Sequence, residues 1–234
     1  MNDILTHLSI PNFFNAPLAW HSLPFILSGL PMTIELTIVS FIGQIILGTL
    51  LTLGQMSHYK WLHWLSRTYI SFMRGTPPIL VLLFLIYFGL PYTGWRVAAF
   101  PAAAAAFILN GAAYVSEIFR SSLLGIDEGQ WVAAQSLGMT HFVTMRDIIL
   151  PQAMRTSIPA MGNVILDLFK GTSLAAMITV TEMFMNAKII GGDNFDYMTV
   201  YLEIALIYWA CCSIITAGQN HLERYVNRNM VNQH

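Results

Sequence analysis

The sequence predicts an all-α integral membrane protein with five transmembrane helices, its N-terminus outside and its C-terminus inside the cytoplasm. Of the 234 residues, 56% are hydrophobic and only 10% are charged, whereas about a quarter of the residues in a typical soluble domain are charged. The apolar residues gather in five stretches near the length of about 20 residues that a spanning helix needs. The positions of Lys and Arg between these stretches indicate the orientation.

The expected spans cover about residues 32–53, 69–90, 97–119, 160–184 and 197–217. The first follows a proline at its outer end. Before it, residues 1–23 hold two prolines, an acid and no basic segment, so we expect no cleavable signal peptide. The first span is therefore expected to be a permanent helix.

The second span has a break near its start, in the segment SFMRGTPPILVLL. Thr76 suits an N-cap and Pro77 the first helical position. A helix from Pro77 to Leu90 would be only about 21 Å long, too short to cross the bilayer alone. The residues before Arg74 must carry the chain part of the way, leaving a break that protein or water has to cover. Such breaks occur in transport pathways and also in ordinary Pro-kinked helices.

The orientation follows from the Lys and Arg residues of the short loops, which are in excess on the cytoplasmic side. With five spans, only Arg96 and Lys188 fall on one side of the membrane. The other side receives Lys60, Arg67, Arg120, Arg146, Arg155, Arg224 and Arg228. This asymmetry places the N-terminus outside and the C-terminus in the cytoplasm.

Other features favour packing over chemistry. The Ala-rich segment FPAAAAAFILNGAAY, residues 100–114, allows close helix contact, either between two permeases or between spans, with lining of the pathway as the alternative. Cys211 and Cys212 are adjacent within an apolar stretch, which excludes a disulfide framework. His58 and His63 offer too few ligands for a metal site, so we expect none. The net charge of −1 gives no indication of nucleic-acid binding.

The loop between the third and fourth spans, about residues 121–157, is much longer than a connection between two helices requires. From Asp127 its sequence favours a short helix with Gly138 at the C′ position. A second helix is expected to begin at Thr140 and to end near Leu150, because a proline follows. Two interpretations remain: a helix-turn-helix whose Ala-rich face docks against another protein, or an amphipathic helix on the membrane surface.

This loop resembles the cytoplasmic EAA loop of ATP-binding cassette importer permeases. The pattern of that loop is Glu-Ala-Ala, three residues, Gly, nine residues, Ile-x-Leu-Pro, and Val132 here stands where the family has Glu. The resemblance implies helix-turn-helix structure and coupling to an ATPase subunit. The implied coupling residues are Gly129, Gln130, Val132, Ala133, Ala134, Gly138, Ile148, Leu150 and Pro151.

Other segments are similar to the polar amino-acid uptake branch of these permeases. They are RGTPPILVLLFLIYFGLP, AYVSEIFRSSLLGIDEGQ, LPQAMRTSIPAMGN and LFKGTSLAAMI. Two positions depart from the branch: Leu83 stands where Gln is frequent, and Gly171 stands where Asp is usual. The match covers nearly everything from Gly29 to Glu182, and residues 1–234 are interpreted as one transmembrane permease domain.

The resemblance implies a permease subunit of an ATP-driven amino-acid importer, multi-pass in the cell membrane. Its implied partners are cytoplasmic ATPase subunits, a second identical or paralogous permease, an extracytoplasmic amino-acid-binding protein and membrane lipid. The chain has no G-x-x-x-x-G-K-[ST] phosphate loop and no room for a nucleotide domain. We therefore expect no enzyme activity and no cofactor in this chain, with ATP and Mg²⁺ in the partner ATPase.

Ionisable residues at membrane depth are candidates for contact with substrate. An amino-acid zwitterion needs an anion for its ammonium group and a donor for its carboxylate. Glu117, Asn163 and Asp167 lie on the two spans that flank the long loop, and we expect them along the pathway. Glu117 with Arg120, and Asp167 with Lys170, also form i,i+3 pairs typical of structural bridges, so both roles stay open.

Two functions of other classes are the alternatives. An ion-coupled secondary transporter of small polar solutes would be expected to show inverted repeats. A membrane-bound enzyme would need a cluster of His, Cys or paired carboxylates at depth. The sequence shows neither feature. The substrate is expected to be a polar amino acid such as cystine, but the polar residues do not rank basic, acidic, amide and sulfur-containing amino acids.

Overall fold

A computed structural model describes residues 14–75 and 84–231, and every regular element in these two stretches is helical. The elements in chain order are α2 (Ala16–Leu27), α3 (Leu30–Gln55), α4 (Lys60–Gly75), η1 (Leu85–Gly89), η2 (Leu90–Thr93), α6 (Ala99–Leu124), α7 (Glu128–Ser136), α8 (His141–Thr144), η3 (Met145–Ile149), α9 (Leu150–Gly171), η4 (Thr172–Ile178), α10 (Met183–Asn194) and α11 (Tyr197–Val231). The predicted all-helical class is confirmed for these residues.

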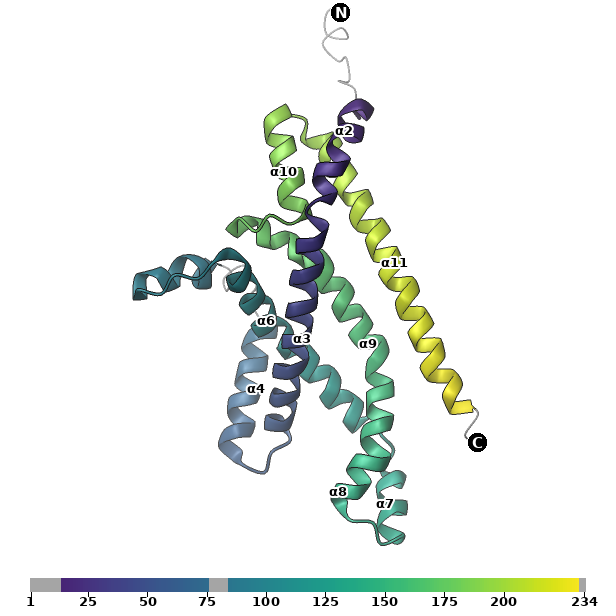
Figure 1. The fold of residues 1–234 in the computed structure, drawn as a ribbon. Coiled ribbons are helices and arrows are strands. Elements are labelled where there is room, and N and C mark those ends of the chain that lie inside the picture. The colour runs from purple at the N-terminus through teal and green to yellow at the C-terminus, as the bar shows by residue number, and fades with distance from the viewer. Residues whose placement is uncertain (1–13, 76–83, 232–234) are drawn as a thin grey trace, which may run out of the picture.

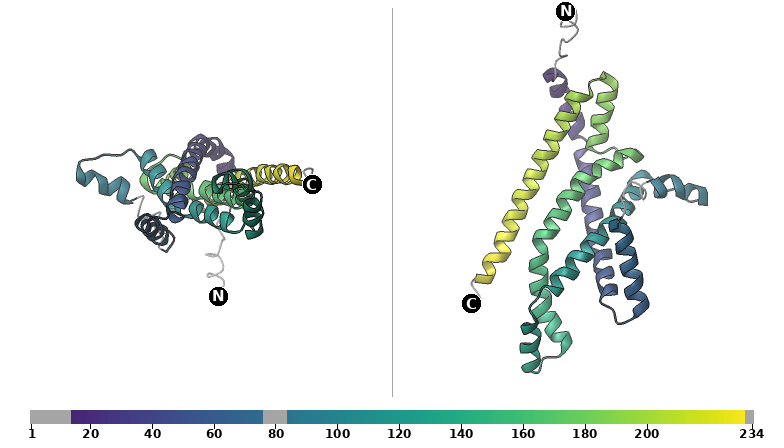
Figure 2. Two further views of the ribbon diagram at one scale, coloured as in Figure 1. Left: turned by 90° about the horizontal axis from the view of Figure 1, so that it is seen from below. Right: turned by 180° about the vertical axis from the view of Figure 1, so that it is seen from behind.

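The long helices lie side by side, and the short ones gather at the two ends (Figure 1). α7 and α8 project from one end, while α2 and α10 occupy the other. α11 runs along the outside of the bundle for most of its length, as the view from behind shows (Figure 2). The long loop therefore forms a knob at one end of the molecule.

Four helical segments of the described residues are long and apolar enough to cross a membrane. They are Leu30–Gln55, Ala99–Leu124, His141–Ile178 and Tyr197–Arg224. The predicted spans 32–53, 97–119 and 197–217 each fall on one of these segments. These three stretches therefore have the length and the apolar character that the sequence indicated.

The fourth span differs from the predicted range of 160–184 at both ends. α8, η3, α9 and η4 form one continuous helical run from His141 to Ile178. The run stops where Thr179 adopts a left-handed conformation with φ of 67°. Glu182 then caps the separate helix α10, because its carboxylate accepts hydrogen bonds from two backbone N–H groups at the start of that helix. The predicted end at residue 184 is wrong because a polar cap starts a new helix inside an apolar stretch.

The second predicted span, 69–90, is not one α-helix in the described residues. α4 ends at Gly75, and the chain is described again from residue 84, where it forms the π-helix η1 and the 3₁₀ helix η2. The expected helix cap at Thr76 and Pro77 lies outside the described residues. The segment expected to be a basic cytoplasmic loop is largely the helix α4 itself.

Small residues allow α3 and α6 to pack closely against each other. A Cβ atom added to Gly48 of α3 would lie 2.7 Å from Cγ1 of Val115 in α6. The Ala-rich segment supplies much of the buried surface of α6, with Ala102, Ala103, Ala104, Ala106, Ala112 and Ala113 all buried. The expected close helix contact of this segment is confirmed as contact between spans.

Buried polar side chains cross the same α3 and α6 interface. Nε2 of Gln44 donates to the backbone oxygen of Phe107 at 3.0 Å. Oγ1 of Thr52 lies 3.1 Å from the backbone oxygen of Ser116 and 2.8 Å from that of Gly48. Because a bilayer offers no water to replace such partners, these hydrogen bonds hold the register of the two helices.

A second polar junction joins α3, α10 and α11 at the opposite end from the knob. Gly29 precedes α3, and a Cβ atom there would lie 2.6 Å from backbone atoms of Glu182 and Met183. The backbone N–H of Met183 donates to Oγ1 of Thr33 at 3.2 Å. The hydroxyl of Tyr208 in α11 donates to the fully buried carboxylate of Glu182 at 2.9 Å. Only a residue without a side chain permits this approach of two backbones.

We predict that Gly29→Ala lowers the free energy of unfolding by about 1–3 kcal/mol, the usual cost of forcing an extra methyl group into a packed site. The measurement is the thermal unfolding midpoint of the protein purified in detergent. Gly218→Ala in α11 is the matched control, because a Cβ atom there meets no heavy atom within 4 Å. An equal response of the two variants would contradict the packing role of Gly29.

Candidate functional site

The knob between α6 and α9 is a helical hairpin with a cap at each start. Oδ1 of Asp127 accepts the backbone N–H of Gly129 at 2.6 Å, and this contact begins α7. Gly138 turns the chain with φ of 75°, in the left-handed region that glycine favours. Oγ1 of Thr140 then accepts the backbone N–H of Val143 at 3.4 Å, which starts α8. The helix-turn-helix expected from the sequence is present in this segment.

The second helix of the hairpin does not end near Leu150, so that prediction is wrong. The chain passes from α8 through the π-turn η3 into α9, with Pro151 in the first turn of α9. Proline normally removes one helical hydrogen bond and clashes with the carbonyl four residues earlier. A π-turn opens the backbone at that place and lets the helix continue past the proline. The knob is thereby joined to a span by an unbroken helix.

The hairpin is held together by its own small core. Ala134 is only 1% exposed, and the Trp131 and His141 rings stack with centroids 5.0 Å apart. Ile149 is fully buried. Ala133 is exposed, so the two alanines of the motif differ in their environment. The small-residue face expected for docking is therefore reduced to Ala133, because Ala134 packs inside the knob.

The outer surface of the hairpin carries large apolar side chains. Val132 is 62% exposed, Leu137 80% and Phe142 72%. Leu137 and Phe142 lie on either side of the turn at Gly138 and were not among the predicted coupling residues. The position of Leu137 directly before the turn glycine and of Phe142 in the first turn of α8 is the sequence signal that could have identified them. The remaining predicted residues are distributed as follows: Gly129, Gln130, Leu150 and Pro151 are exposed, and Ile148 is half-buried.

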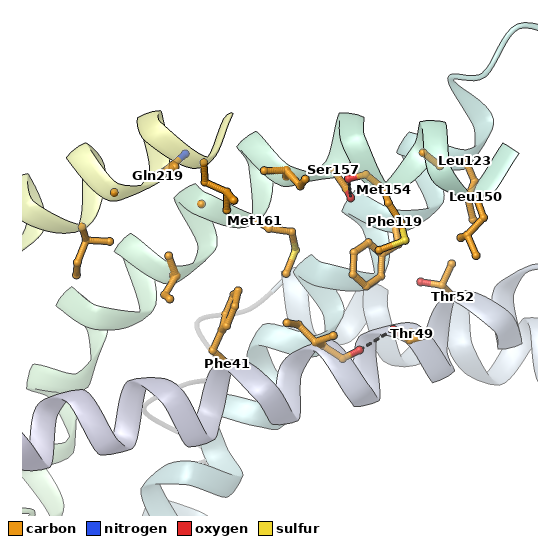
Figure 3. Close-up of a pocket in the computed structure, with 18 of the residues that line it drawn as sticks. Phe41, Thr49, Thr52, Phe119, Leu123, Leu150, Met154, Ser157, Met161 and Gln219 are labelled. Carbon is orange, nitrogen blue, oxygen red and sulfur yellow. Dashed lines mark hydrogen bonds between the residues drawn. The ribbon is translucent and has the colours of Figure 1, made fainter. Parts of the chain in front are cut away.

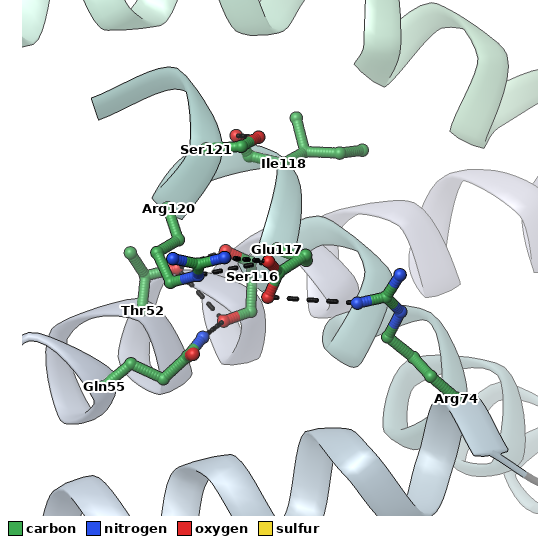
Figure 4. A network of polar contacts seen from close by, with 8 residues as sticks. All are labelled: Thr52, Gln55, Arg74, Ser116, Glu117, Ile118, Arg120 and Ser121. Carbon is green, nitrogen blue, oxygen red and sulfur yellow. Dashed lines mark hydrogen bonds and ion pairs between the residues drawn. The ribbon is translucent and has the colours of Figure 1, made fainter. Parts of the chain in front are cut away.

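A polar pocket of about 620 Å³ lies between α3, α4 and α6. Glu117 lies between two arginines in it (Figure 4). Nε of Arg120 donates to Oε1 of Glu117 at 3.1 Å, and Nη2 of Arg120 also contacts this oxygen. Nη1 of Arg74 lies 3.9 Å from Oε2 of Glu117. The rest of the wall includes Gln55, His63, Arg67 and Ser71.

Asn163 and Asp167 lie on α9, apart from this pocket. Both are exposed, and Asp167 pairs with Lys170 at 2.9 Å. No polar contact joins either residue to Glu117 in the described parts of the chain. Both predicted i,i+3 pairs are confirmed. Arg74, in contrast, reaches Glu117 from a different helix, a contact that spacing along one helix could not reveal.

A larger cavity of about 700 Å³ between α3, α6, α9 and α11 is almost entirely apolar (Figure 3). Three hydroxyl groups in its wall donate to backbone oxygens within their own helices. These belong to Thr49, Thr52 and Ser157. A charged amino acid would find few free polar partners here, whereas the polar pocket offers several.

Comparison with known proteins places the chain in a family. Residues 44–228 match the family described as "Binding-protein-dependent transport system inner membrane component". The chain is 50% identical over 211 residues to the "Probable amino-acid ABC transporter permease protein YckA" of Bacillus subtilis (strain 168), over 90% of this chain and 93% of that protein. It is 43% identical over 206 residues to the "L-cystine transport system permease protein TcyB" of the same strain, over 88% of each chain.

A solved structure supports the same assignment. The "Crystal structure of an amino acid ABC transporter with histidines" matches with a TM-score of 0.82 and 36% identity, over 86% of this chain and 94% of that chain. The relatives are multi-pass membrane permease subunits rather than enzymes, in agreement with the prediction. The chain therefore belongs to the binding-protein-dependent inner membrane components and, among them, to the permeases of amino-acid ABC transporters.

Proposed function

We propose that this chain is the permease subunit of an ATP-driven amino-acid importer and that its hairpin, α7 and α8, docks a cytoplasmic ATPase subunit. The observation that carries the docking proposal is the exposed apolar surface formed by Val132, Leu137 and Phe142. Such a surface on a hairpin that projects from the bundle fits a protein partner. The family assignment favours this function over the ion-coupled secondary transporter considered from the sequence.

The proposed topology has five crossings, with the hairpin end in the cytoplasm. The start of α4, which holds Lys60, and the connection from α6 to α9 lie toward that end (Figure 1), and the excess of Lys and Arg in cytoplasmic loops supports this orientation. α4 and the short helices η1 and η2 belong to the second crossing. The N-terminus is then outside and the C-terminus inside.

The partners of this proposal follow the family. Two cytoplasmic ATPase subunits bind ATP and Mg²⁺, an extracytoplasmic binding protein delivers the amino acid, and a second permease, identical or paralogous, completes the pathway. This chain binds no nucleotide and no nucleic acid. The whole of residues 1–234 acts as a single transmembrane permease domain.

Coupling relies on the continuous helical run from His141 to Ile178. A helix of this length is about 57 Å long at 1.5 Å per residue. Because η3 carries the helix past Pro151 without a gap, a displacement of the docked hairpin moves α9 directly. Rocking of α9 against α6 and α3 then switches the pathway between outward-facing and inward-facing states.

The proposed substrate is a polar amino acid. The relatives named above include one described for L-cystine, and another, 36% identical over 208 residues, is the "Arginine transport system permease protein ArtQ" of Bacillus subtilis (strain 168). Because these names differ in substrate charge, cystine is one candidate within the class. The proposed pathway residues are Glu117, Asn163 and Asp167. Of these three, Glu117 lies in the polar pocket, among several other polar side chains.

We predict ATP-dependent uptake of one class of amino acid when the chain is reconstituted in liposomes with its ATPase and binding protein. The measurement is accumulation of a panel of labelled amino acids with ATP and with a non-hydrolysable analogue. Accumulation should be at least about tenfold greater with ATP. Equal uptake without ATP would instead support the secondary transporter.

We predict that Leu137→Glu lowers co-purification of the ATPase at least about tenfold, because it places a charge at the centre of an apolar contact. Membrane insertion and the unfolding midpoint of the permease should stay unchanged, since Leu137 is exposed in this chain. Leu137→Met, which keeps an apolar side chain, is the control. Undiminished co-purification with Leu137→Glu would remove Leu137 from the docking surface.

The turn at Gly138 supports a separate prediction. Gly138→Val places a β-branched residue at φ of 75°, a conformation such residues rarely adopt. We expect Gly138→Val to distort the hairpin and reduce ATP-driven uptake severalfold. Gly138→Asn should retain most of the activity, because Asn tolerates the left-handed region and a Cβ atom meets no neighbour there. Equal activity of both variants would show that the turn geometry is unimportant.

A further inference from the structure

The helix α4 has three distinct faces. One face is buried against the bundle and includes Ser66, Ile70 and Met73. A second face is exposed and apolar, with Trp61, Trp64, Leu65 and Phe72 each more than half exposed. The third face is polar and consists of Lys60, His63, Arg67, Ser71 and Arg74, spaced three or four residues apart. Residues at this spacing share one side of a helix, and α4 contains no acidic residue.

The polar face extends to a depth where cations are costly. Arg74 lies 14 residues beyond Lys60, about 21 Å along the helix at 1.5 Å per residue. α4 runs back alongside α3 from the short turn at the hairpin end of the molecule (Figure 1). In the proposed topology Lys60 lies at the cytoplasmic boundary of the hydrocarbon layer, which is about 30 Å thick, so Arg74 lies within that layer. Charged side chains at such depth face protein or a water-filled cavity and not lipid.

The charges on this face are not balanced within the part of the chain that the structure describes. The Glu117 carboxylate accepts both of its hydrogen bonds from the guanidinium group of Arg120. Arg74 lies 3.9 Å from the other carboxylate oxygen, is 46% exposed, and lies over the Tyr114 ring at 5.8 Å. No ion pair within 4 Å involves Arg67 in the described residues. Three guanidinium groups face one carboxylate, so the arginines and Glu117 together carry an excess of two positive charges.

We propose that the polar face of α4, together with Glu117 and Arg120, lines a water-filled part of the transport pathway and binds the carboxylate of the passing amino acid. Arg74 and Arg67 supply the free donors for that carboxylate, since guanidinium groups match carboxylate oxygens in geometry. Glu117, already paired with Arg120, holds the arginines in place. The pocket favours substrates whose side chains are neutral or anionic over cationic ones. This inference rests on the proposed function, because it takes the amino acid as the occupant of the pocket.

The test uses cysteine accessibility in the complete transporter, reconstituted with its ATPase and binding protein without nucleotide. Cys211 and Cys212 are first replaced by serine. Ser71→Cys then places one thiol on the polar face, where Ser71 is exposed. Leu65→Cys is the matched control on the apolar face of the same helix, where Leu65 is 52% exposed. The probes are membrane-impermeant methanethiosulfonate reagents, one anionic and one cationic.

We predict that Ser71→Cys is modified and Leu65→Cys is not. For Ser71→Cys we compare the modification rate of the anionic reagent with that of the cationic one. The ratio of these two rates should be at least about threefold greater than the ratio measured for 2-mercaptoethanol in solution. One net positive charge about 7 Å away in water is enough for this difference. The ratio cancels any change in thiolate fraction, because both reagents attack the same thiolate.

Neutralising the proposed carboxylate donors should remove the preference. Arg74→Gln together with Arg67→Gln is expected to bring the reagent ratio at Ser71→Cys within about twofold of its solution value. An unreactive Ser71→Cys would mean that protein covers this face, and a reactive thiol whose ratio ignores both arginines would mean that they do not select charge. Either result overturns the inference. ATP-dependent uptake, measured separately, tests the importer function and can fail while the accessibility result holds.

Discussion

The lack of water inside the bilayer is the constraint on which the rest of this structure depends. Each backbone polar group on a span must find a partner within the protein or face water, and a polar side chain there is costly unless it is paired. In α3, Nε2 of Gln44 and Nε2 of Gln55 meet this requirement by donating to the backbone oxygen of Phe107 and to Oγ of Ser116 in α6. Glu182 meets it through two backbone N–H groups and the Tyr208 hydroxyl. These contacts fix the register of the helices because each polar group has few other acceptable positions.

The two cavities differ in whether the polar groups of their walls already have partners within the chain. Thr49, Thr52 and Ser157 in the wall of the large cavity direct their hydroxyl groups to their own helices, so its surface is apolar. The smaller pocket instead gathers Arg67, Arg74, Arg120 and Glu117 from two helices. Only the smaller pocket offers charged groups to a polar amino acid.

The hairpin and the span that follows it form one mechanical unit. The Gly138 turn and the buried Ala134 hold α7 against α8, while the π-turn η3 joins α8 to α9 without an interruption. Exposed apolar residues lie on the outer side of the hairpin, away from the small core that holds it together. A rigid hairpin on a continuous helix can transmit force from a docked partner, whereas a flexible loop would absorb it.

The sequence by itself determined the membrane class, the positions of three spans, the family and the helix-turn-helix, because apolar content, caps and turn glycines act over short distances. It did not reveal that α8 continues past Pro151, since a π-turn is not evident from the residue preferences that mark proline as a helix end. Nor did it reveal that Glu182 begins a new helix, that Ala134 is buried while Ala133 is exposed, or that Arg74 approaches Glu117 from another helix. Only the tertiary structure decided these points, because each depends on which helices pack together.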